Sequence, residues 1–591
     1  MSSINSFTVA DYLLTRLHQL GLRKVFQVPG DYVANFMDAL EQFNGIEAVG
    51  DLTELGAGYA ADGYARLTGI GAVSVQFGVG TFSVLNAIAG SYVERNPVVV
   101  ITASPSTGNR KTIKETGVLF HHSTGDLLAD SKVFANVTVA AEVLSDPSDA
   151  RQKIDKALTL AITFRRPIYL EAWQDVWGLA CEKPEGELKA LPLISEEGAL
   201  KAMLADSLKL LNSARQPLVL LGVEINRFGL QDAVLDLLKA SGLPYSTTSL
   251  AKTVISENEG IFVGTYADGA SFPATVEYIE KADCVLALGV IFTDDYLTML
   301  SKQFDQMIVV NNDETSRLGH AYYHQLYLAD FILQLTDEIK KSSLYPRQNS
   351  ALPLLPPQPQ ITPALLQQQL SYQNFFDLFY GYLLQHQLQD NISLILGESS
   401  SLYMSARLYG LPQDSFIADA AWGSLGHETG CVTGIAYASD KRAMAIAGDG
   451  GFMMMCQCLS TISRHQLNSV VFVISNKVYA IEQSFVDICA FAKGGHFAPF
   501  DLLPTWDYLS LAKAFSVEGY RVQNGEELLQ ALEHIMTQKD KPALVEVVIQ
   551  SQDLAPAMAG LVKSITGHTV EQCAIPTGST ENLYFQSGAL E

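Results

Sequence analysis

Two groups of polar residues in the last third of the chain combine types that bind a metal ion together with a phosphate. An aspartate lies among glycines in Gly448-Asp449-Gly450-Gly451, and Asn476 ends a later apolar segment. Glycines let backbone N–H groups approach a phosphate, but the carboxylate of Asp449 would repel that phosphate unless a cation lay between them. Carboxylate and amide oxygens are hard ligands that suit Mg2+. The pattern therefore predicts a magnesium site that also holds a phosphate or diphosphate group.

The segments around these residues must bring them together. The strand-like segment AMAIAG leads into the glycines, a helix-like apolar segment follows, and the strand-like segment SVVFVISN ends at Asn476. In such a β-turn-α-β unit the ends of both strands lie at the same edge of a parallel sheet. We therefore expect Asp449 and Asn476 to converge. For the glycine-aspartate run alone, an ordinary acidic turn in an α/β sheet is an equally good interpretation, because such short motifs often occur without the function they indicate.

The composition is typical of a large, acidic and well-buried globular protein. The chain has 591 residues, of which 48% are hydrophobic and 17% charged, and its net charge is −24. The charge makes a nucleic acid or an anionic membrane an unfavourable partner, and no segment approaches the length of a membrane span. The seven cysteines form no CxxC pair or regular framework, and the N-terminus lacks a signal-peptide pattern. These features favour a reducing cytoplasm.

Alternating strand-like and helix-like segments divide the chain into three α/β domains, each expected to be a doubly wound parallel sheet. The expected divisions are a first domain at 1–178, a middle domain at 194–341, a proline-rich linker at 342–363, a third domain at 364–560 and a C-terminal segment at 561–577. Residues 578–591 contain ENLYFQS, a viral-protease cleavage sequence used in protein expression, and are interpreted as a tag remnant. The first and third domains are expected to share one architecture.

Several side chains of the first domain have both a chemical and a structural interpretation. Asp31 follows a strand-like segment and could cap the next helix. Glu54 lies in an Asp51-x-x-Glu54 pattern, which is typical of a capping box. His121 and His122 are adjacent and would chelate a metal poorly, so solvated loop histidines are the plainer interpretation. Local sequence alone therefore leaves the role of each residue open.

The order of motifs along the chain resembles that of thiamine-diphosphate-dependent 2-oxo-acid decarboxylases, which include pyruvate and indolepyruvate decarboxylases. The shared motifs are VPGDY, ELGAGYAADGYARLTG, FHHSTGD, WGSLG, GDGG and SNKVYAIE, and they span nearly the whole natural chain. The resemblance implies thiamine diphosphate and Mg2+ as cofactors, with a pyrimidine-binding first domain and a diphosphate-binding third domain. It also implies non-oxidative decarboxylation of a 2-oxo acid to an aldehyde and CO2 through the cofactor ylid.

The resemblance gives each site residue an implied role. Asp449, Asn476 and the backbone carbonyl of Val478 correspond to the metal ligands. Glu54 corresponds to the glutamate that hydrogen-bonds the cofactor pyrimidine, and Leu425 to the apolar wedge that folds the two cofactor rings together. The other implied cofactor-binding positions are Gly423, Ser399, Gly450, Gly451 and Ile481.

Four ionisable residues resemble the cluster that protonates the reacting carbon and releases the aldehyde in this family. They are Asp31, His121, His122 and Glu482. In the family, the first domain of one subunit faces the third domain of another. The resemblance therefore implies a homodimer or homotetramer with active sites between subunits, in which Glu54 serves a cofactor held by the neighbouring chain.

A few positions bear on substrate size. Ile481 resembles the isoleucine of pyruvate-preferring relatives, and Phe485, one helical turn later, narrows the pocket further. Ser400 and Ser401 fall where relatives place bulky aromatic residues, and Leu396 replaces an expected polar contact. We therefore expect an apolar pocket that accepts pyruvate and longer linear 2-oxo acids but resists indole-sized ones.

Two other functions were weighed against decarboxylation. A carboligase of the acetolactate-synthase kind would use the same ylid but pass the intermediate to a second carbonyl compound. A cofactor-binding regulatory or structural protein without turnover would have lost the proton relay, whereas Glu54, Asp31 and Glu482 are all present. The adjacent residues His121 and His122 favour a decarboxylase over a carboligase.

Overall fold

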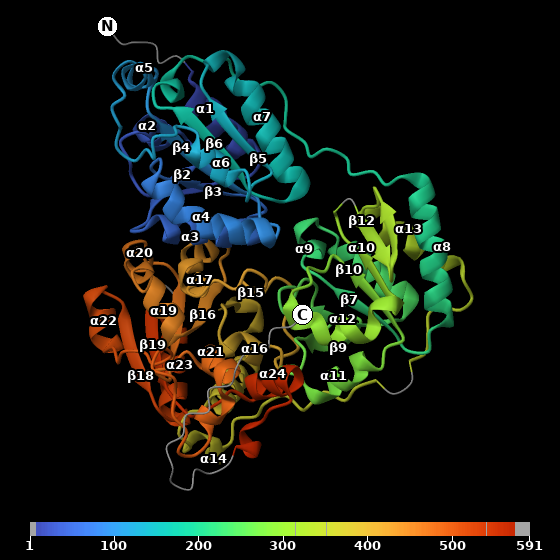
Figure 1. The fold of residues 1–591 in the computed structure, drawn as a ribbon. Helices are drawn as coiled ribbons and strands as arrows, with labels where there is room; N and C mark the ends of the chain where they lie inside the picture. The colour runs from blue at the N-terminus through green and yellow to red at the C-terminus, as the bar shows by residue number, and fades with distance from the viewer. Residues whose placement is uncertain (1–6, 314, 350–351, 539–540, 574–591) are drawn as a thin grey trace.

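The computed structural model describes residues 7–313, 315–349, 352–538 and 541–573 and folds them into three α/β units (Figure 1). The segment 578–591, interpreted as a tag remnant, lies outside the described residues, as does the end of the segment 561–577. Among the described helices there is no candidate for a membrane span.

The first unit is a six-stranded parallel sheet with the order β2-β1-β3-β4-β6-β5. Its strands are β1 (Lys24–Gln27), β2 (Glu47–Gly50), β3 (Gly71–Ser74), β4 (Val98–Ser104), β5 (Ala140–Leu144) and β6 (Ile168–Trp173). Its helices are α1 (Val9–Gln19), α2 (Ala34–Gln42), α3 (Glu54–Thr68), α4 (Val79–Val93), α5 (Thr107–Thr116), α6 (Ala129–Phe134) and α7 (Pro147–Phe164). Every residue of β4 is buried, as expected for a central strand that is covered on both faces.

The middle unit is a seven-stranded sheet with the order β13-β12-β11-β10-β7-β8-β9. Its strands are β7 (Pro217–Leu221), β8 (Pro244–Thr248), β9 (Ile261–Tyr266), β10 (Cys284–Leu288), β11 (Met307–Val310), β12 (Thr315–Leu318) and β13 (Ala321–His324). Its helices are α8 (Glu197–Ser213), α9 (Glu224–Arg227), α10 (Gln231–Ser241), α11 (Pro273–Glu280), α12 (Leu297–Gln303) and α13 (Leu328–Lys341). The expected parallel sheet here carries an antiparallel edge, because β12 and β13 form a hairpin around Gly319, whose φ is +53°.

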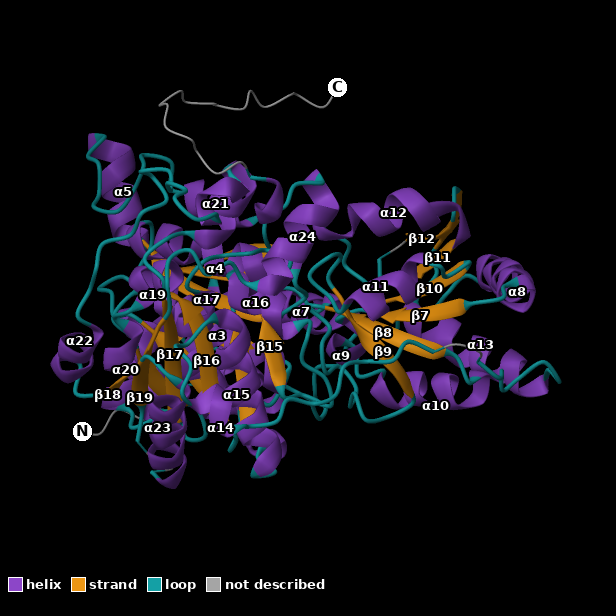
Figure 2. Ribbon diagram, turned by 90° about the horizontal axis from the view of Figure 1, so that it is seen from below, coloured by secondary structure: helices purple, strands orange, loops and turns teal. Residues whose placement is uncertain are grey.

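The third unit repeats the strand order of the first, as β15-β14-β16-β17-β19-β18, and all its strands are parallel. Its strands are β14 (Ile392–Leu396), β15 (Phe416–Ala418), β16 (Arg442–Gly448), β17 (Ser469–Ser475), β18 (Glu518–Val522) and β19 (Ala543–Val548). Its helices are α14 (Pro363–Leu366), α15 (Tyr372–Gln385), α16 (Ser400–Ser405), α17 (His427–Gly430), α18 (Val432–Ala438), α19 (Asp449–Met455), α20 (Cys458–Arg464), α21 (Ala480–Val486), α22 (Tyr508–Ala514), α23 (Gly525–Thr537) and α24 (Pro556–Thr566). Helices lie on both sides of the strands (Figure 2), and the expected fold class is confirmed.

Small residues let the first and third units pack closely, with α3 and α4 facing α17 and α20 (Figure 1). A Cβ on Gly63 of α3 would lie 2.7 Å from the carbonyl oxygen of Cys431, and a Cβ on Gly434 of α18 would lie 1.8 Å from that of Ala60. A side chain at either glycine would push the two helices apart. A single hydrophobic core accordingly runs through both units.

Two of the seven cysteines form a disulfide. Cys489 lies in the short helix η5 (Ile488–Phe491), and its partner Cys573 directly follows η6 (Val570–Gln572). The spacing of the cysteines did not predict this bond, because the two thiols meet only where α24 and η6 pack against α21 and η5. The bond therefore joins the last described residues to η5, the short helix that follows α21.

Candidate active site

The parallel strands β16 and β17 bring Asp449 and Asn476 together, as the sequence predicts. The two strands pair up to the last residue of β16, so Asp449, which begins α19, lies beside the end of β17. Asp449 Oδ2 accepts a 2.6 Å hydrogen bond from the backbone N–H of Lys477. Asn476 Oδ1 accepts a 3.3 Å hydrogen bond from the backbone N–H of Val478. Oxygen atoms from both strand ends therefore lie on one turn at the carboxyl edge of the sheet.

The turn after Asn476 has a constrained backbone. Lys477 has a φ of +65°, a left-handed conformation that costs a non-glycine residue about 1–2 kcal/mol. Ser551 Oγ donates a 2.6 Å hydrogen bond to the carbonyl oxygen of Asn476, and Val478 forms a β-bridge with Leu502. These contacts fix the directions of the Asn476 side chain and of the Val478 backbone.

The carboxylate of Asp449 is buried without a basic partner. Its side chain belongs to a residue that is 2% exposed, and burial raises its pKa to about 7 even though backbone N–H groups donate to it. No basic side chain from the described part of the chain lines its cavity. A Cβ on Gly450 would lie 2.2 Å from the Tyr479 ring, so the backbone here can approach a ligand only as glycine. The donor set therefore fits a divalent cation that holds a diphosphate.

Most of the site residues expected from the sequence line one cavity, named here the cofactor cavity. They are Ser399, Leu425, Asp449, Gly450, Gly451, Asn476, Val478, Ile481 and Glu482. The cavity opens at the carboxyl ends of β14 and β16, where the direction of the chain connections reverses. Ligands of open α/β sheets bind at such switch points.

A second cavity of about 750 Å3 adjoins the first and is named here the substrate cavity. Gly423 lines it, and apolar walls come from Leu297, Trp422, Ile481, Phe485 and Ile565. Five carboxyl side chains also line it, with no basic side chain from the described ranges: Asp268, Asp294, Asp295, Glu398 and Glu482. The substrate cavity is therefore acidic as well as apolar, which the sequence did not predict.

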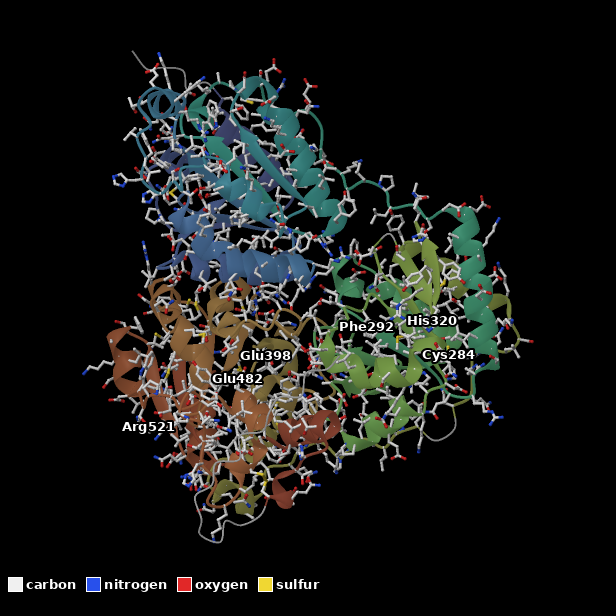
Figure 3. The ribbon with its side chains drawn as sticks, viewed as in Figure 1. Cys284, Phe292, His320, Glu398, Glu482 and Arg521 are labelled. Atoms are coloured by element: carbon white, nitrogen blue, oxygen red, sulfur yellow. A yellow bond between two sulfur atoms is a disulfide. The ribbon has the colours of Figure 1, made fainter. Side chains whose placement is uncertain are left out.

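The end of β14 places its polar side chain at a different position from the expected one. Leu396 is fully buried in the strand and lines neither cavity. Ser401 is also buried outside both cavities, whereas Ser400 lines the cofactor cavity. The residue that reaches both cavities from this strand end is Glu398 (Figure 3), which sequence reasoning missed. A carboxyl residue separated from a buried strand only by Gly397 was the signal that could have found it.

Four expected site residues of the first unit lie outside both cavities. They are Asp31, Glu54, His121 and His122. Asp31 Oδ1 accepts a 2.5 Å hydrogen bond from Gln76 Nε2. The Tyr32 hydroxyl donates a 3.3 Å hydrogen bond to the carbonyl oxygen of His121, and the Tyr32 ring contacts His122 edge-on. The residues expected to form one site thus lie in two separate groups, one in the first unit and one in the third, and these groups are named here the two half-sites.

Neither Asp31 nor Glu54 has the capping role that its local sequence allowed. Helix α2 has no side-chain cap at its N-terminus. Helix α3 is capped by Thr53, whose Oγ1 accepts a 3.1 Å hydrogen bond from Gly56, and not by Asp51. The capping-box interpretation of Glu54 is therefore wrong, and neither carboxyl group caps a helix.

A buried ionic network supports the loop that carries Gly423 and Leu425. Arg66 of α3 pairs with Asp62 at 2.7 Å and with Glu94 at 2.6 Å, and all three side chains are buried. Burial acts to raise the pKa of Asp62, but Arg66 and His427 outweigh it and hold this pKa well below its usual range. The network thus keeps its charges compensated between the first and third units.

Comparison with known protein families matches all three units. Residues 7–131 match the N-terminal TPP binding domain of thiamine pyrophosphate enzymes, residues 204–334 match their central domain, and residues 399–547 match their C-terminal TPP binding domain.

Known relatives and solved structures extend over nearly the whole chain. The chain is 30% identical over 569 residues to pyruvate decarboxylase 2 of Oryza sativa subsp. japonica, covering 93% of this chain and 90% of the rice protein. It is 31% identical over 568 residues to an alpha-keto-acid decarboxylase of Mycolicibacterium paratuberculosis, covering 94% and 96%. The thiamine diphosphate-dependent 4-hydroxybenzoylformate decarboxylase of Rhodococcus jostii RHA1 has the same fold, with a TM-score of 0.71 at 19% identity over 92% of this chain and 99% of that one.

Proposed function

The chain belongs to the thiamine pyrophosphate enzymes, within their 2-oxo-acid decarboxylases, and from this premise we propose how its residues carry out the reaction. The protein is a thiamine-diphosphate-dependent carboxy-lyase, as the resemblance of its motifs predicts. The observation that carries the mechanism is the convergence of Asp449, Asn476, Ile481 and Glu482 on one cavity. Residues 1–178 would form the pyrimidine-binding domain, 194–341 the middle domain and 364–560 the diphosphate-binding domain.

Asp449, Asn476 and the carbonyl of Val478 would hold Mg2+, and the glycines after Asp449 would leave room for the diphosphate. This assignment is supported by the buried, uncompensated carboxylate of Asp449 and by the fixed turn at Lys477. When bound, thiamine diphosphate supplies a carbon nucleophile and takes up the electron pair that CO2 leaves behind. The remaining contacts are proposed for Ser399, Gly423 and Leu425.

The proton transfers would be made by carboxyl and imidazole side chains. Glu54 would donate a hydrogen bond to the pyrimidine ring or accept one from it. Protons would reach the product through four residues, which are Asp31, His121, His122 and Glu482. Side chains of these types transfer protons efficiently near neutral pH.

Each active site would be completed by two copies of the chain. The two half-sites of one chain share no cavity, and exposed apolar side chains flank both of them. Next to the first half-site they are Leu52, Val79 and Leu119, and next to the second they are Met454, Val486 and Phe500. Burying such surface between copies would stabilise an assembly by roughly 25 cal/mol per Å2. A homodimer or homotetramer is the proposed form.

The substrate would be pyruvate or a longer linear 2-oxo acid. Ile481 and Phe485 supply apolar walls, and the carboxyl groups of the substrate cavity would repel a second carboxylate on the substrate. A cytoplasmic location is proposed on the five free thiols and the acidic composition.

A product analysis tests this function. The protein would be incubated with thiamine diphosphate, Mg2+ and pyruvate, 2-oxobutanoate or 2-oxopentanoate, and aldehyde, acyloin and acetolactate-type products would be quantified. Aldehyde and CO2 in equal amounts are expected. Acyloin or acetolactate-type compounds as the main products would indicate a carboligase, and no turnover with any 2-oxo acid would refute catalysis.

A further inference from the structure

Glu398 lies in the wall between the cofactor cavity and the substrate cavity. It follows β14 and immediately precedes Ser399, the residue that caps α16. Its side chain lines both cavities, as does that of Glu482 (Figure 3). A Cβ on Gly423 would lie 3.6 Å from Glu398 Oε2, so the carboxyl group reaches the loop proposed to contact the cofactor. Glu398 therefore lies beside the place where cofactor and substrate react.

The surroundings of Glu398 favour its protonated form. The Tyr403 hydroxyl donates a 3.1 Å hydrogen bond to Oε1. The ionisable groups that face it are Asp294 and Asp295 from η2 (Asp294–Tyr296), Glu482 from α21 and Tyr403 from α16, and Asp268 lines the same cavity. None of them carries a positive charge. Burial raises the pKa of Glu398 to about 7, and the carboxylate of Asp295 adds to this effect.

The pKa of Asp295, a carboxyl group that also lines the substrate cavity, is raised as well. Burial raises the pKa of Asp295 to about 6, with Asp294 contributing as a like charge. The Tyr403 hydroxyl interacts with both carboxyl groups, and the charge of Asp295 disfavours the charged form of Glu398, so a protonated carboxyl group is present here at neutral pH. Within the described residues, Glu398 and Glu482 are the carboxyl groups that line both cavities.

We propose that Glu398 is a further acid–base residue of the decarboxylation, an assignment that rests on the proposed function. In the net reaction the bond between the carbonyl carbon and the carboxylate breaks, CO2 leaves, and the electron pair stays with the carbon. A proton must then form the C–H bond of the aldehyde. Glu398 supplies it as its O–H bond breaks, and the resulting carboxylate regains a proton from water through Asp295. The 2-oxo acid and one proton give the aldehyde and CO2, with no other reactant.

Glu398→Gln separates this role from a structural one, because glutamine keeps the acceptor for Tyr403 but cannot carry the proton. A positioned acid contributes roughly 100-fold to 10,000-fold to rate. We therefore expect kcat to fall at least about 100-fold with KM changed less than about threefold. The kcat of the wild type is expected to fall as pH rises through about 7, because Glu398 then loses its proton, and this fall should be absent in Glu398→Gln. Glu277→Gln, an exposed glutamate in an i,i+4 pair with Lys281, is the control and should keep the wild-type profile.

A second variant and a spectroscopic readout make the test independent of turnover. Asp295→Asn removes a like charge beside Glu398, so the fall in kcat should move to lower pH. In cofactor-free protein, infrared difference spectra between pH 6 and pH 8 should contain a carboxylic-acid band that is weaker in Glu398→Gln, because Asp449 and Glu428 titrate in the same range and keep part of it.

Three results would overturn the assignment: an unchanged pH profile in Glu398→Gln, an unchanged profile in Asp295→Asn, or an infrared band whose intensity is the same without Glu398. If the wild type forms no aldehyde, the proposed function fails as well. If the wild type forms aldehyde and Glu398→Gln does so equally well, the assignment of Glu398 alone fails.

Discussion

Glu94 of the first unit accepts, through Oε1, a 2.7 Å hydrogen bond from the backbone N–H of Ala421 in the third unit. The same oxygen accepts a weaker bond from the N–H of Trp422, and the other carboxyl oxygen pairs with Arg66. Glu94 therefore holds the loop that carries Gly423 in place through hydrogen bonds from the first unit of the same chain.

Glu94→Gln is expected to destabilise the protein and to weaken cofactor binding. The substitution leaves Arg66 with one fewer compensating carboxylate in a buried network, and breaking a buried pair costs about 3–5 kcal/mol. Thermal unfolding with and without thiamine diphosphate measures both effects. Glu277→Gln, which breaks an exposed pair, is the control and should leave the melting temperature unchanged. A melting temperature for Glu94→Gln equal to that of the wild type would contradict the supporting role of the network.

Asp449→Ala is expected to lose retention of thiamine diphosphate, because Mg2+ would lose its carboxylate ligand. Calorimetric titration of the cofactor in the presence of Mg2+ measures the loss. Asp440→Ala, at an exposed position, is the matched control. Full binding by Asp449→Ala would count against the metal assignment.

Mixing two inactive variants is expected to restore activity. In a dimer that contains one Glu54→Gln chain and one Asp449→Ala chain, one active site combines both substitutions and the other combines Glu54 of one chain with Asp449 of the other. The wild-type site should therefore recover part of the activity after co-expression. Light scattering at assay concentration would establish the assembly. An active monomer, or co-expressed variants that stay inactive, would refute the shared site.

Glu428 gives a pH dependence of stability. Its residue is 2% exposed, its Oε2 has no hydrogen-bond partner in the described structure, and burial raises its pKa from 4.5 to about 7. The folded state thus binds a proton that the unfolded state releases, so this contribution to stability is present below pH 4.5 and is lost as pH rises through 7. The difference in free energy of unfolding between Glu428→Gln and the wild type should therefore shift in favour of the variant by roughly 1–3 kcal/mol between pH 5 and pH 8. Paired melting curves across this range test it, and a difference independent of pH would disprove it.

Ile481→Val is expected to raise kcat/KM for aromatic 2-oxo acids. One fewer methylene in the wall of the substrate cavity changes discrimination by roughly 1–3 kcal/mol. The parent should accept pyruvate, 2-oxobutanoate and 2-oxopentanoate with similar kcat/KM and phenylpyruvate poorly. A steep loss from pyruvate to 2-oxobutanoate in the parent, or no gain with phenylpyruvate in the variant, would show that other residues set the specificity.

The third-domain half of the site could be predicted from sequence because its residues directly follow neighbouring strands. Asp449 and Asn476 each come at the end of an apolar run, and parallel pairing of β16 and β17 places such ends together. Glu398 could not be assigned in this way, since sequence does not show at which residue β14 leaves the sheet. Leu396 was chosen in its place, and the structure buries it in the strand.

Other features depend on contacts between distant segments. The antiparallel hairpin of β12 and β13 consists of short strands, whose exposed residues carry little hydrophobic pattern. The caps were misjudged because α2 begins only at Ala34, too far along the chain for Asp31 to cap it, and because Thr53, which is nearer to α3 than Asp51 is, takes the cap position. The acidic lining of the substrate cavity comes from both the middle and third units, so no single motif contains it.

Because Cys489 and Cys573 form a disulfide, the buffer in which a sample is stored can change the covalent state of the protein. The disulfide ties the segment that follows α24, whose residues Ser564 and Ile565 line the substrate cavity, to η5, which follows α21, and α21 lines the same cavity with Ile481, Glu482 and Phe485. A buffer that contains a reductant opens this tie, and a buffer without one preserves it. Two preparations of the same chain could then differ in whether Cys489 and Cys573 are bonded. A thiol titration before each kinetic measurement shows which form is being assayed.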